Sequence, residues 1–210
     1  MKTKAQYHFY RLLSALLTVA MLLSIVPVAQ AEEMHSDLEG HWAQAVMQEF
    51  SSAGYIESSA EGRYLPDEAI NRAQFAGIIN RLMGYTVEST AMAQYTDVSV
   101  DDWYYHDLAK ALAAGYMLGT SQTEMSPEAS LTREQAMVML VRILDIDAAE
   151  ADLTVLDKFH DADAISDYAQ ASAAVMAEKG YANGDDQGNL LPQKVLTRAE
   201  AVAMLSRIKA

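Results

Sequence analysis

The sequence predicts an all-α fold in which three helix-loop-helix copies form a pseudo-threefold unit with a central helical bundle. Two observations predict this: residues recur at fixed offsets along the chain, and each copy contains two stretches with helical apolar periodicity. The chain has 210 residues and no cysteine, so an apolar core has to hold it together. One helix pair is too small to bury both of its apolar faces, and we therefore expect the copies to close on one another.

Five positions with the same spacing define the repeat. An aromatic residue is followed thirteen positions later by tyrosine, then after eleven, six and nine further positions by proline, arginine and a second arginine. The three sets are Trp42, Tyr55, Pro66, Arg72 and Arg81; Trp103, Tyr116, Pro127, Arg133 and Arg142; and Tyr168, Tyr181, Pro192, Arg198 and Arg207. The connectors differ in length, which places the copies at 32–90, 91–152 and 153–210. Leu153 and Leu156 predict a short helix in the second connector.

Residues 1–31 are predicted to be a signal peptide. Basic residues precede an apolar run over 12–28, and Ala29–Ala31 supplies a small-residue cleavage pattern. An uncleaved membrane anchor is the alternative, because the run approaches the length that spans a bilayer. The segment holds three basic and no acidic residues, so cleavage changes the net charge from -14 to -17. We therefore expect a secreted protein that binds neither nucleic acid nor, after cleavage, membrane, and that holds any acidic polymer through a few local cations.

The first helix of each copy is expected to begin near the aromatic residue. It is expected to end at Gly54, Gly115 or Gly180, because a glycine followed by tyrosine is typical of a left-handed helix stop. An apolar stripe with spacing i, i+4, i+7 marks its buried face. The stripe residues are Ala43, Met47 and Phe50; Tyr104, Leu108 and Ala111; and Ala169, Ala173 and Met176.

The second helix is predicted to begin at a capping box. Asn71, Thr132 or Thr197 stands three residues before a glutamine or glutamate, which is the spacing of that motif, with asparagine in place of Ser/Thr in copy one. Its apolar face has the spacing i, i+3, i+4, i+7. The face comprises Phe75, Ile78, Ile79 and Leu82; Ala136, Met139, Leu140 and Ile143; and Ala201, Met204, Leu205 and Ile208.

Arg72, Arg133 and Arg198 occupy the first helical position of the three copies. Helix formation does not explain them, because the positive end of the helix dipole opposes a cation there. Free backbone N–H groups at a helix start together with a guanidinium group favour binding of carboxylate or phosphate, so we predict an anion site. The alternative is structural: an arginine stem packed on an aromatic ring, or an ion pair with one of the many acids.

Trp42, Trp103 and Tyr168 are more typical of a core that seals the bundle, although a flat aromatic face would also suit stacking against a sugar. The second arginine of each copy lies in the last turn of its helix, where the dipole favours a cation. That placement explains these arginines structurally, and we predict no site for them.

The motifs together resemble the S-layer homology (SLH) family. Copy three has the sequence Leu196–Glu200 after Gly180 and Tyr181, copy two has Thr132–Gln135, and copy one has His41–Ala43. The resemblance implies a pseudo-trimer whose inter-repeat grooves hold a pyruvylated, peptidoglycan-linked secondary cell-wall polysaccharide, with S-layer or envelope proteins as further partners. It implies arginines that face the ketal carboxylate, and aromatics and loop glycines that shape the groove. The implied ligand-binding residues are Arg72, Arg133, Arg198, Trp42, Trp103, Tyr168, Gly119 and Gly184.

Departures from the family pattern predict unequal sites. Ser58 and Thr123 each replace a loop glycine, and Tyr168 replaces tryptophan. A β-carbon narrows a pocket where backbone and ligand approach closely.

Catalysis, calcium binding and binding of a protein partner are the alternatives to wall binding. Catalysis is not indicated, because the chain has no HExxH or GxSxG motif and no cysteine. The loop 183–188 resembles a calcium loop weakly, but its twelfth position is Lys194, where a bidentate carboxylate is required. We expect no cofactor and no metal. A protein partner, with the chain acting as an envelope adaptor, stays open.

Overall fold

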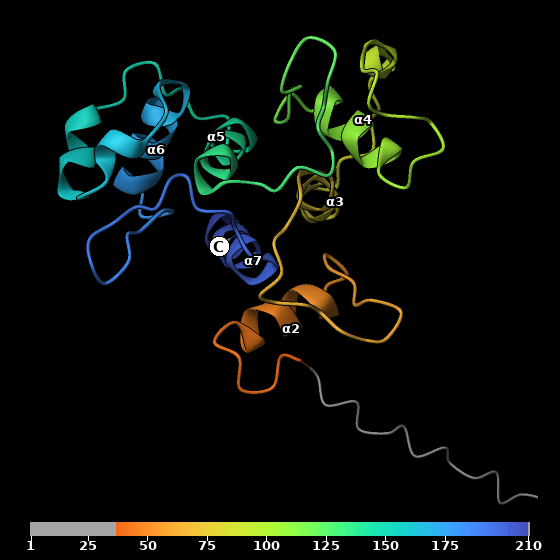
Figure 1. Ribbon diagram of the computed structural model, residues 1–210, viewed down its shortest axis with the longest axis horizontal. Helices are drawn as coiled ribbons and strands as arrows, with labels where there is room; N and C mark the ends of the chain where they lie inside the picture. Colours follow the sequence, from red (N-terminus) through yellow and green to blue (C-terminus); the bar gives the residue numbers. More distant parts are fainter. Residues whose placement is uncertain (1–36, 210) are drawn as a thin grey trace, which may run out of the picture. The chain divides into compact units, whose positions relative to one another are not determined.

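The computed structural model describes residues 37–209, and the predicted signal peptide lies outside them. Each copy contributes two α-helices, and short 3-10 helices lie in the connectors (Figure 1). The first helices are α2 (Gln44–Ser52), α4 (Tyr105–Ala113) and α6 (Gln170–Glu178), and the second are α3 (Arg72–Met83), α5 (Arg133–Ile143) and α7 (Arg198–Lys209). The 3-10 helices are η1 (Thr90–Gln94), η2 (Leu153–Lys158), η3 (Ala162–Ala164) and η4 (Asp167–Ala169). Over residues 37–209 there are only isolated β-bridges and no strand, which confirms the all-α prediction.

The local signals act as the sequence predicts. Gly54, Gly115 and Gly180 adopt φ values of 76°, 75° and 73°, the left-handed conformation in which glycine avoids a steric penalty. The capping boxes form as expected. The Asn71 and Thr132 side chains accept hydrogen bonds from the N–H groups three residues on, and the glutamine side chains at those positions accept from the cap N–H in return. Thr197 and Glu200 make the same reciprocal pair.

The helices bury the predicted apolar faces against neighbouring copies. Every residue of the first-helix stripes is at most 8% exposed. Helix α3 packs on α4, α5 packs on α6, and α7 returns to α2, so the second helix of each copy contacts the first helix of the next. Figure 1 shows α3, α5 and α7 between the outer helices α2, α4 and α6. The three copies therefore share one core.

The segments that precede the second helices join in a ring of backbone hydrogen bonds. Ile70 N–H donates to Leu196 O at 3.0 Å, Leu131 N–H to Ile70 O at 3.0 Å, and Leu196 N–H to Leu131 O at 2.9 Å. All three side chains are fully buried. The ring gives each copy the same bonds in the same order, as approximate threefold symmetry requires. The sequence does not predict this ring, because a backbone pairing between distant copies leaves no local motif.

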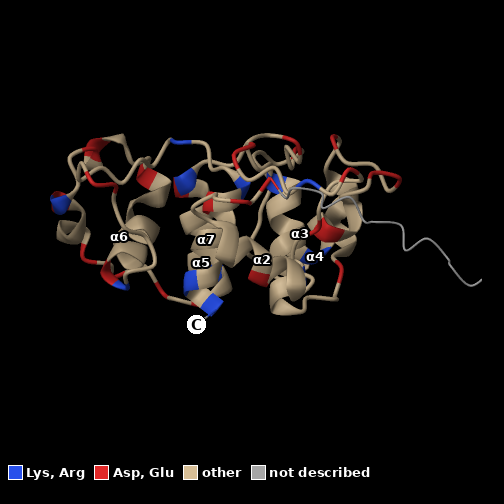
Figure 2. Cartoon of the chain, turned by 90° about the horizontal axis from the view of Figure 1, so that it is seen from below, with Lys and Arg blue, Asp and Glu red and all other residues tan. Residues whose placement is uncertain are grey.

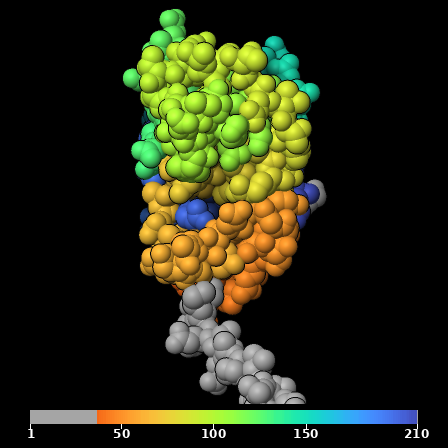
Figure 3. Space-filling model, turned by 90° about the vertical axis from the view of Figure 1, so that its right-hand side faces the viewer, coloured from red at the N-terminus to blue at the C-terminus, as the bar shows by residue number. Residues whose placement is uncertain are grey.

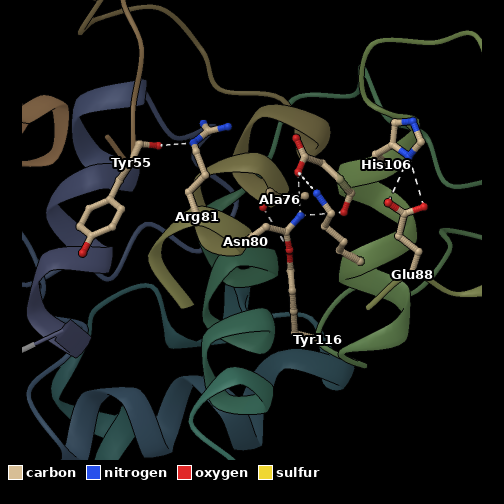
Figure 4. A network of polar contacts seen from close by, with 9 residues as sticks. Tyr55, Ala76, Asn80, Arg81, Glu88, His106 and Tyr116 are labelled. Atoms are coloured by element: carbon tan, nitrogen blue, oxygen red, sulfur yellow. Dashed lines mark hydrogen bonds and ion pairs between the residues drawn. The ribbon is translucent and has the colours of Figure 1, made fainter. Parts of the chain in front are cut away.

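One buried polar cluster distinguishes the α3–α4 contact from the other two. Asn80, 3% exposed, donates from Nδ2 to the Asp107 carbonyl at 2.9 Å and to its carboxylate at 3.0 Å. The Tyr116 hydroxyl donates to Asn80 Oδ1 at 2.8 Å, as Figure 4 shows. Copies two and three have Val141 and Ser206 in place of Asn80. The helix pairs are therefore alike in geometry and different in chemistry.

The predicted short helix in the second connector is present as η2, and Leu156 on it is buried. In the first connector, η1 places Met92 against the core. A membrane-crossing helix, which needs length and continuous apolarity, is not found among residues 37–209. Figure 2 shows many of the acidic residues on the loops along one edge of this part of the chain, with basic residues between them.

Candidate functional site

Three grooves lie between the copies, and each is built from all three of them. A groove takes the first arginine of one copy, the loop and second helix of the next copy, and the aromatic residue of the third. Groove 1 has a volume of about 400 Å³, and grooves 2 and 3 have about 260 Å³ each. Groove 1 includes Arg72, Gly119, Gln135, Arg142 and Tyr168; groove 2 includes Arg133, Gly184, Glu200, Arg207 and Trp42; groove 3 includes Arg198, Glu57, Gln74, Arg81 and Trp103.

The surface view shows the same composition. On the face drawn in Figure 3, a hollow separates segments of copy one (orange) from segments of copy two (yellow to green). Residues from the C-terminal part of the chain (blue) are visible inside it. Groove 3 has this make-up, since it is lined by Arg81 of copy one, Trp103 of copy two and Arg198 of copy three. No single copy could form such a groove by itself.

The first arginines hold the loop of the following copy. Arg72 Nε donates to Met125 O at 2.9 Å, and its Nη2 donates to Leu118 O at 2.8 Å. Arg198 makes the equivalent bonds to Tyr64 O at 2.8 Å and Glu57 O at 3.4 Å. The structure thus corrects the interpretation that no structural requirement explains these arginines, because charged donors to the backbone carbonyls of a neighbouring copy stabilise a fold.

Arg133 is bound less completely than the other two first arginines. Its Nη2 donates to Asn183 O at 2.7 Å, but its buried Nε has no hydrogen-bond partner among the residues that the structure describes. Burial lowers the pKa of Arg72, Arg133 and Arg198, and neighbouring acids oppose that shift. All three guanidinium groups stay protonated at neutral pH, because an arginine pKa begins far above 7.

The backbone N–H groups at the start of the second helices are not free. Arg72 N–H donates to Ala129 O at 3.1 Å, and Ala73 N–H donates to Pro127 O at 2.9 Å. The corresponding N–H groups of Arg133 and Arg198 also donate to carbonyls of the following copy. The expectation of an anion cradle made of helix N–H groups was therefore wrong. An anion in these grooves would be bound by guanidinium groups instead.

An aspartate in each copy fixes the loop that the arginine touches. Asp97 accepts hydrogen bonds from Met125 N–H at 2.9 Å and Ser126 N–H at 2.7 Å. Asp37 and Asp161 accept the equivalent pairs in their own copies. Ser126 has a φ of 50°, an unfavourable value for a residue with a side chain, so the loop needs this support. Met125 thus donates its N–H to Asp97 and accepts a hydrogen bond from Arg72 at its carbonyl.

The three aromatic residues line the grooves and are not core. Trp42 and Trp103 are 64% exposed and Tyr168 is 59% exposed. The expectation that they seal the bundle was therefore wrong. They line grooves 2, 3 and 1 respectively with more than half of their surface exposed, where a sugar ring could stack.

Tyr168 replaces tryptophan together with a second change nearby. Its hydroxyl donates to Glu134 Oε1 at 2.8 Å, and Glu134, 2% exposed, also accepts from Ser166 N–H at 3.0 Å and Oγ at 2.8 Å. The other copies have Ala73 and Ala199 in place of Glu134. Burial and this carboxylate raise the pKa of Tyr168 to about 12. The phenol stays neutral at physiological pH and is fixed by its hydroxyl.

The second arginines, Arg81, Arg142 and Arg207, also line the grooves. The prediction that they belong to no site did not anticipate this placement. Arg81 Nε donates to Tyr55 O at 2.8 Å (Figure 4), and Nη1 of Arg142 and of Arg207 donates to the equivalent tyrosine carbonyls at 3.4 and 3.2 Å. Arg207 lowers the pKa of Arg133 by repulsion, although burial is the larger cause. Their recurrence nine residues after the first arginine was the available signal.

The two loop glycines lie in grooves 1 and 2, and internal packing accounts for them. A β-carbon on Gly119 would lie 2.5 Å from Ser121 O and 2.6 Å from Tyr95 Cε1. On Gly184 it would lie 3.0 Å from Asn189 O and from Phe159 Cε1. Gly119 is thus required for the loop to close on its own copy, and a β-carbon at Gly184 would force its neighbours to shift slightly, whether or not a ligand is present.

Comparisons with known proteins agree with this architecture. The model of the S-layer homology domain family matches residues 36–76, 94–137 and 158–202. The surface-layer 125 kDa protein of Lysinibacillus sphaericus is 31% identical over 196 residues, which are 90% of this chain and 16% of that protein. An exoglucanase of Acetivibrio thermocellus is 28% identical over 81% of this chain and 16% of its own length. The cellulosome-anchoring protein of the same species is 34% identical over 76 residues, 36% of this chain and 17% of that protein. The matched stretches thus span about a sixth of the length of each of these relatives.

Proposed function

Because the chain belongs to the S-layer homology domain family, we propose that it is a non-catalytic module that attaches to the bacterial cell wall by binding an anionic polysaccharide in its grooves. We further propose that residues 1–31 direct its export and that the bound polymer is the pyruvylated, peptidoglycan-linked type. Relatives named as a surface-layer protein and a cellulosome-anchoring protein support a role in attachment.

The observation that carries this proposal is the threefold recurrence of two arginines beside an exposed aromatic ring. A guanidinium group presents planar donors that fit a carboxylate, and an aromatic face fits the apolar face of a pyranose. The protein has a net charge of -14, so its surface as a whole repels a polyanion. Attraction would come from the grooves, where the cations are gathered.

Sedimentation with purified wall sacculi tests the proposal. We expect the chain to pellet with intact walls and to stay in the supernatant when hydrofluoric acid has stripped the non-peptidoglycan polysaccharide. Walls from which only the pyruvyl groups have been removed test the finer proposal, and binding should fall there too. Equal binding to intact and stripped walls would contradict polysaccharide recognition and would favour a protein or peptidoglycan partner.

The structure indicates which arginines can be replaced to test binding without a loss of stability. Arg72, Arg133 and Arg198 support the fold, so their loss weakens binding and stability together. Arg81, Arg142 and Arg207 are exposed, and each makes one hydrogen bond to a tyrosine carbonyl. A variant with alanine at these three positions should therefore keep its helical circular dichroism and lose wall binding.

A further inference from the structure

The grooves have the same plan and different charges. The described residues that line groove 1 include Arg72 and Arg142 and no carboxylate. Groove 3 sets Glu57 and Asp107 beside its two arginines. Groove 2 has a third cation, Lys194, together with Asp185 and Glu200. Lys194 is paired with Glu200, so neither charge is fully available to a ligand. The lining charge is therefore most positive and least compensated in groove 1.

These differences come from single positions of the repeat. Groove 1 has Leu118 where groove 3 has Glu57, Gln135 where groove 2 has Glu200, and Thr120 where groove 2 has Asp185. The aspartates that hold the loops do not rank the grooves, because each first arginine has one of them nearby: Asp97 for Arg72, Asp161 for Arg133 and Asp37 for Arg198.

We propose that groove 1 is the principal anion site of this protein and that groove 3 binds anions most weakly. This inference rests on the proposed function and ranks its three sites. Charges outside a groove matter less, because screening in physiological salt limits their range to about 8 Å. Within a groove, a carboxylate repels an acidic ligand. The larger volume of groove 1, about 400 against 260 Å³, acts in the same direction.

Glu134 lies outside the lining of groove 1 and accepts a hydrogen bond from the Tyr168 hydroxyl. It is 2% exposed, and its oxygens accept three hydrogen bonds from Ser166 and Tyr168. The charge of Glu134 is thus committed to positioning the aromatic ring, while Arg142 is exposed to solvent. Groove 1 therefore has an aromatic ring, that of Tyr168, and no carboxylate among the described residues that line it.

The chain carries its own reporters for a test. It has two tryptophans, Trp42 in groove 2 and Trp103 in groove 3, whereas groove 1 has Tyr168. Fragments of the wall polysaccharide are titrated into the full chain while calorimetry measures affinity and NMR follows the two indole N–H signals. We expect the tightest binding event to saturate with both indole signals unmoved. An indole signal that moves in step with that event would overturn the ranking.

Matched arginine variants give the second measurement. Arg142→Ala, Arg81→Ala and Arg207→Ala each remove one hydrogen bond to an equivalent tyrosine carbonyl, so their structural costs are comparable. We expect Arg142→Ala to weaken the tightest binding about tenfold, the effect of losing one charge-assisted hydrogen bond. Arg81→Ala should change it less than about twofold, since that arginine faces groove 3. Equal losses in the two variants would contradict the proposal.

A gain of binding gives the third measurement. Glu57→Gln combined with Asp107→Asn removes both carboxylates of groove 3 and keeps their shapes, including the acceptor that Asp107 offers to Asn80. We expect a new binding event that moves the Trp103 indole signal. If the unaltered chain binds and this variant gains nothing, the ranking by charge fails and wall binding stands. If the unaltered chain binds no polysaccharide, the proposed function fails and the ranking falls with it.

Discussion

The segment before each second helix and the groove beside it are close neighbours, yet they differ in how far the three copies agree. At the pseudo-threefold axis, Ile70, Leu131 and Leu196 make the same backbone bonds and are equally buried. In the grooves, equivalent positions hold Glu57, Leu118 and Asn183. Backbone bonds need only an apolar side chain that fits the core, so they withstand divergence between copies. Side-chain charge has no such constraint at an exposed position.

This contrast shows that grooves with the same architecture need not have the same affinity for a ligand. The frame of each groove is a loop backbone whose carbonyls accept hydrogen bonds from an arginine and whose N–H groups donate to an aspartate, and it is almost the same three times. The chemistry that distinguishes one groove from another comes from side chains that make no bonds in this frame, such as those of Glu57, Leu118 and Asn183. The copies can therefore specialise without loss of the fold.

The largest effect is expected at the axis. Leu131→Ala should lower the free energy of unfolding by about 3 kcal/mol, because a fully buried leucine leaves a cavity there. Leu118→Ala in the groove 1 loop should cost less than about 1 kcal/mol, since that side chain is 49% exposed. Urea unfolding followed by circular dichroism measures both. Similar losses would show that axis and groove do not differ in this way.

The first arginines should rank by the bonds they make to the next copy. Arg72→Ala should cost about 2–3 kcal/mol, because the Met125 and Leu118 carbonyls both lose a charged donor. Arg133→Ala should cost about 1 kcal/mol, because only the Asn183 carbonyl loses its donor and the unpaired Nε is removed as well. The same unfolding measurement compares them, and the reverse order would contradict the assignment of these contacts.

The smallest effect concerns Tyr168 and alkaline pH. Its pKa is raised to about 12 in the fold, against 10.0 for an ordinary tyrosine, so the unfolded chain ionises first as pH rises. The stabilisation is complete below pH 10 and is lost between pH 10 and about 12. Tyr168→Phe should therefore lose less stability than the unaltered chain across this range in urea titrations at stepped pH. The difference between the two proteins isolates the contribution of Tyr168. Parallel curves would show that Glu134 does not hold this hydroxyl.

The local structure of this protein follows from short patterns in its sequence. The glycine stops, the capping boxes and the apolar stripes act over a few residues, so they could be identified from spacing alone, as could the three copies and their family. The arginines of the site could be named too, because their recurrence is visible in the chain. Their surroundings could not. The sequence indicated free N–H groups beside them and a core position for the aromatics, and both expectations were wrong.

Only the tertiary structure decided what each groove contains. Arg198 meets the carbonyl of Tyr64, 134 residues earlier in the chain, and Tyr168 meets Glu134 of another copy. Such contacts depend on how the copies close on one another, and no local pattern encodes that closure. In the closed arrangement the helix N–H groups donate to carbonyls of the following copy, and the aromatic rings are exposed. The same arrangement places a first arginine and a second arginine in each groove. The repeat identifies the arginines and aromatic residues of the site, whereas only the folded chain shows which of the three unequal grooves each of them lines.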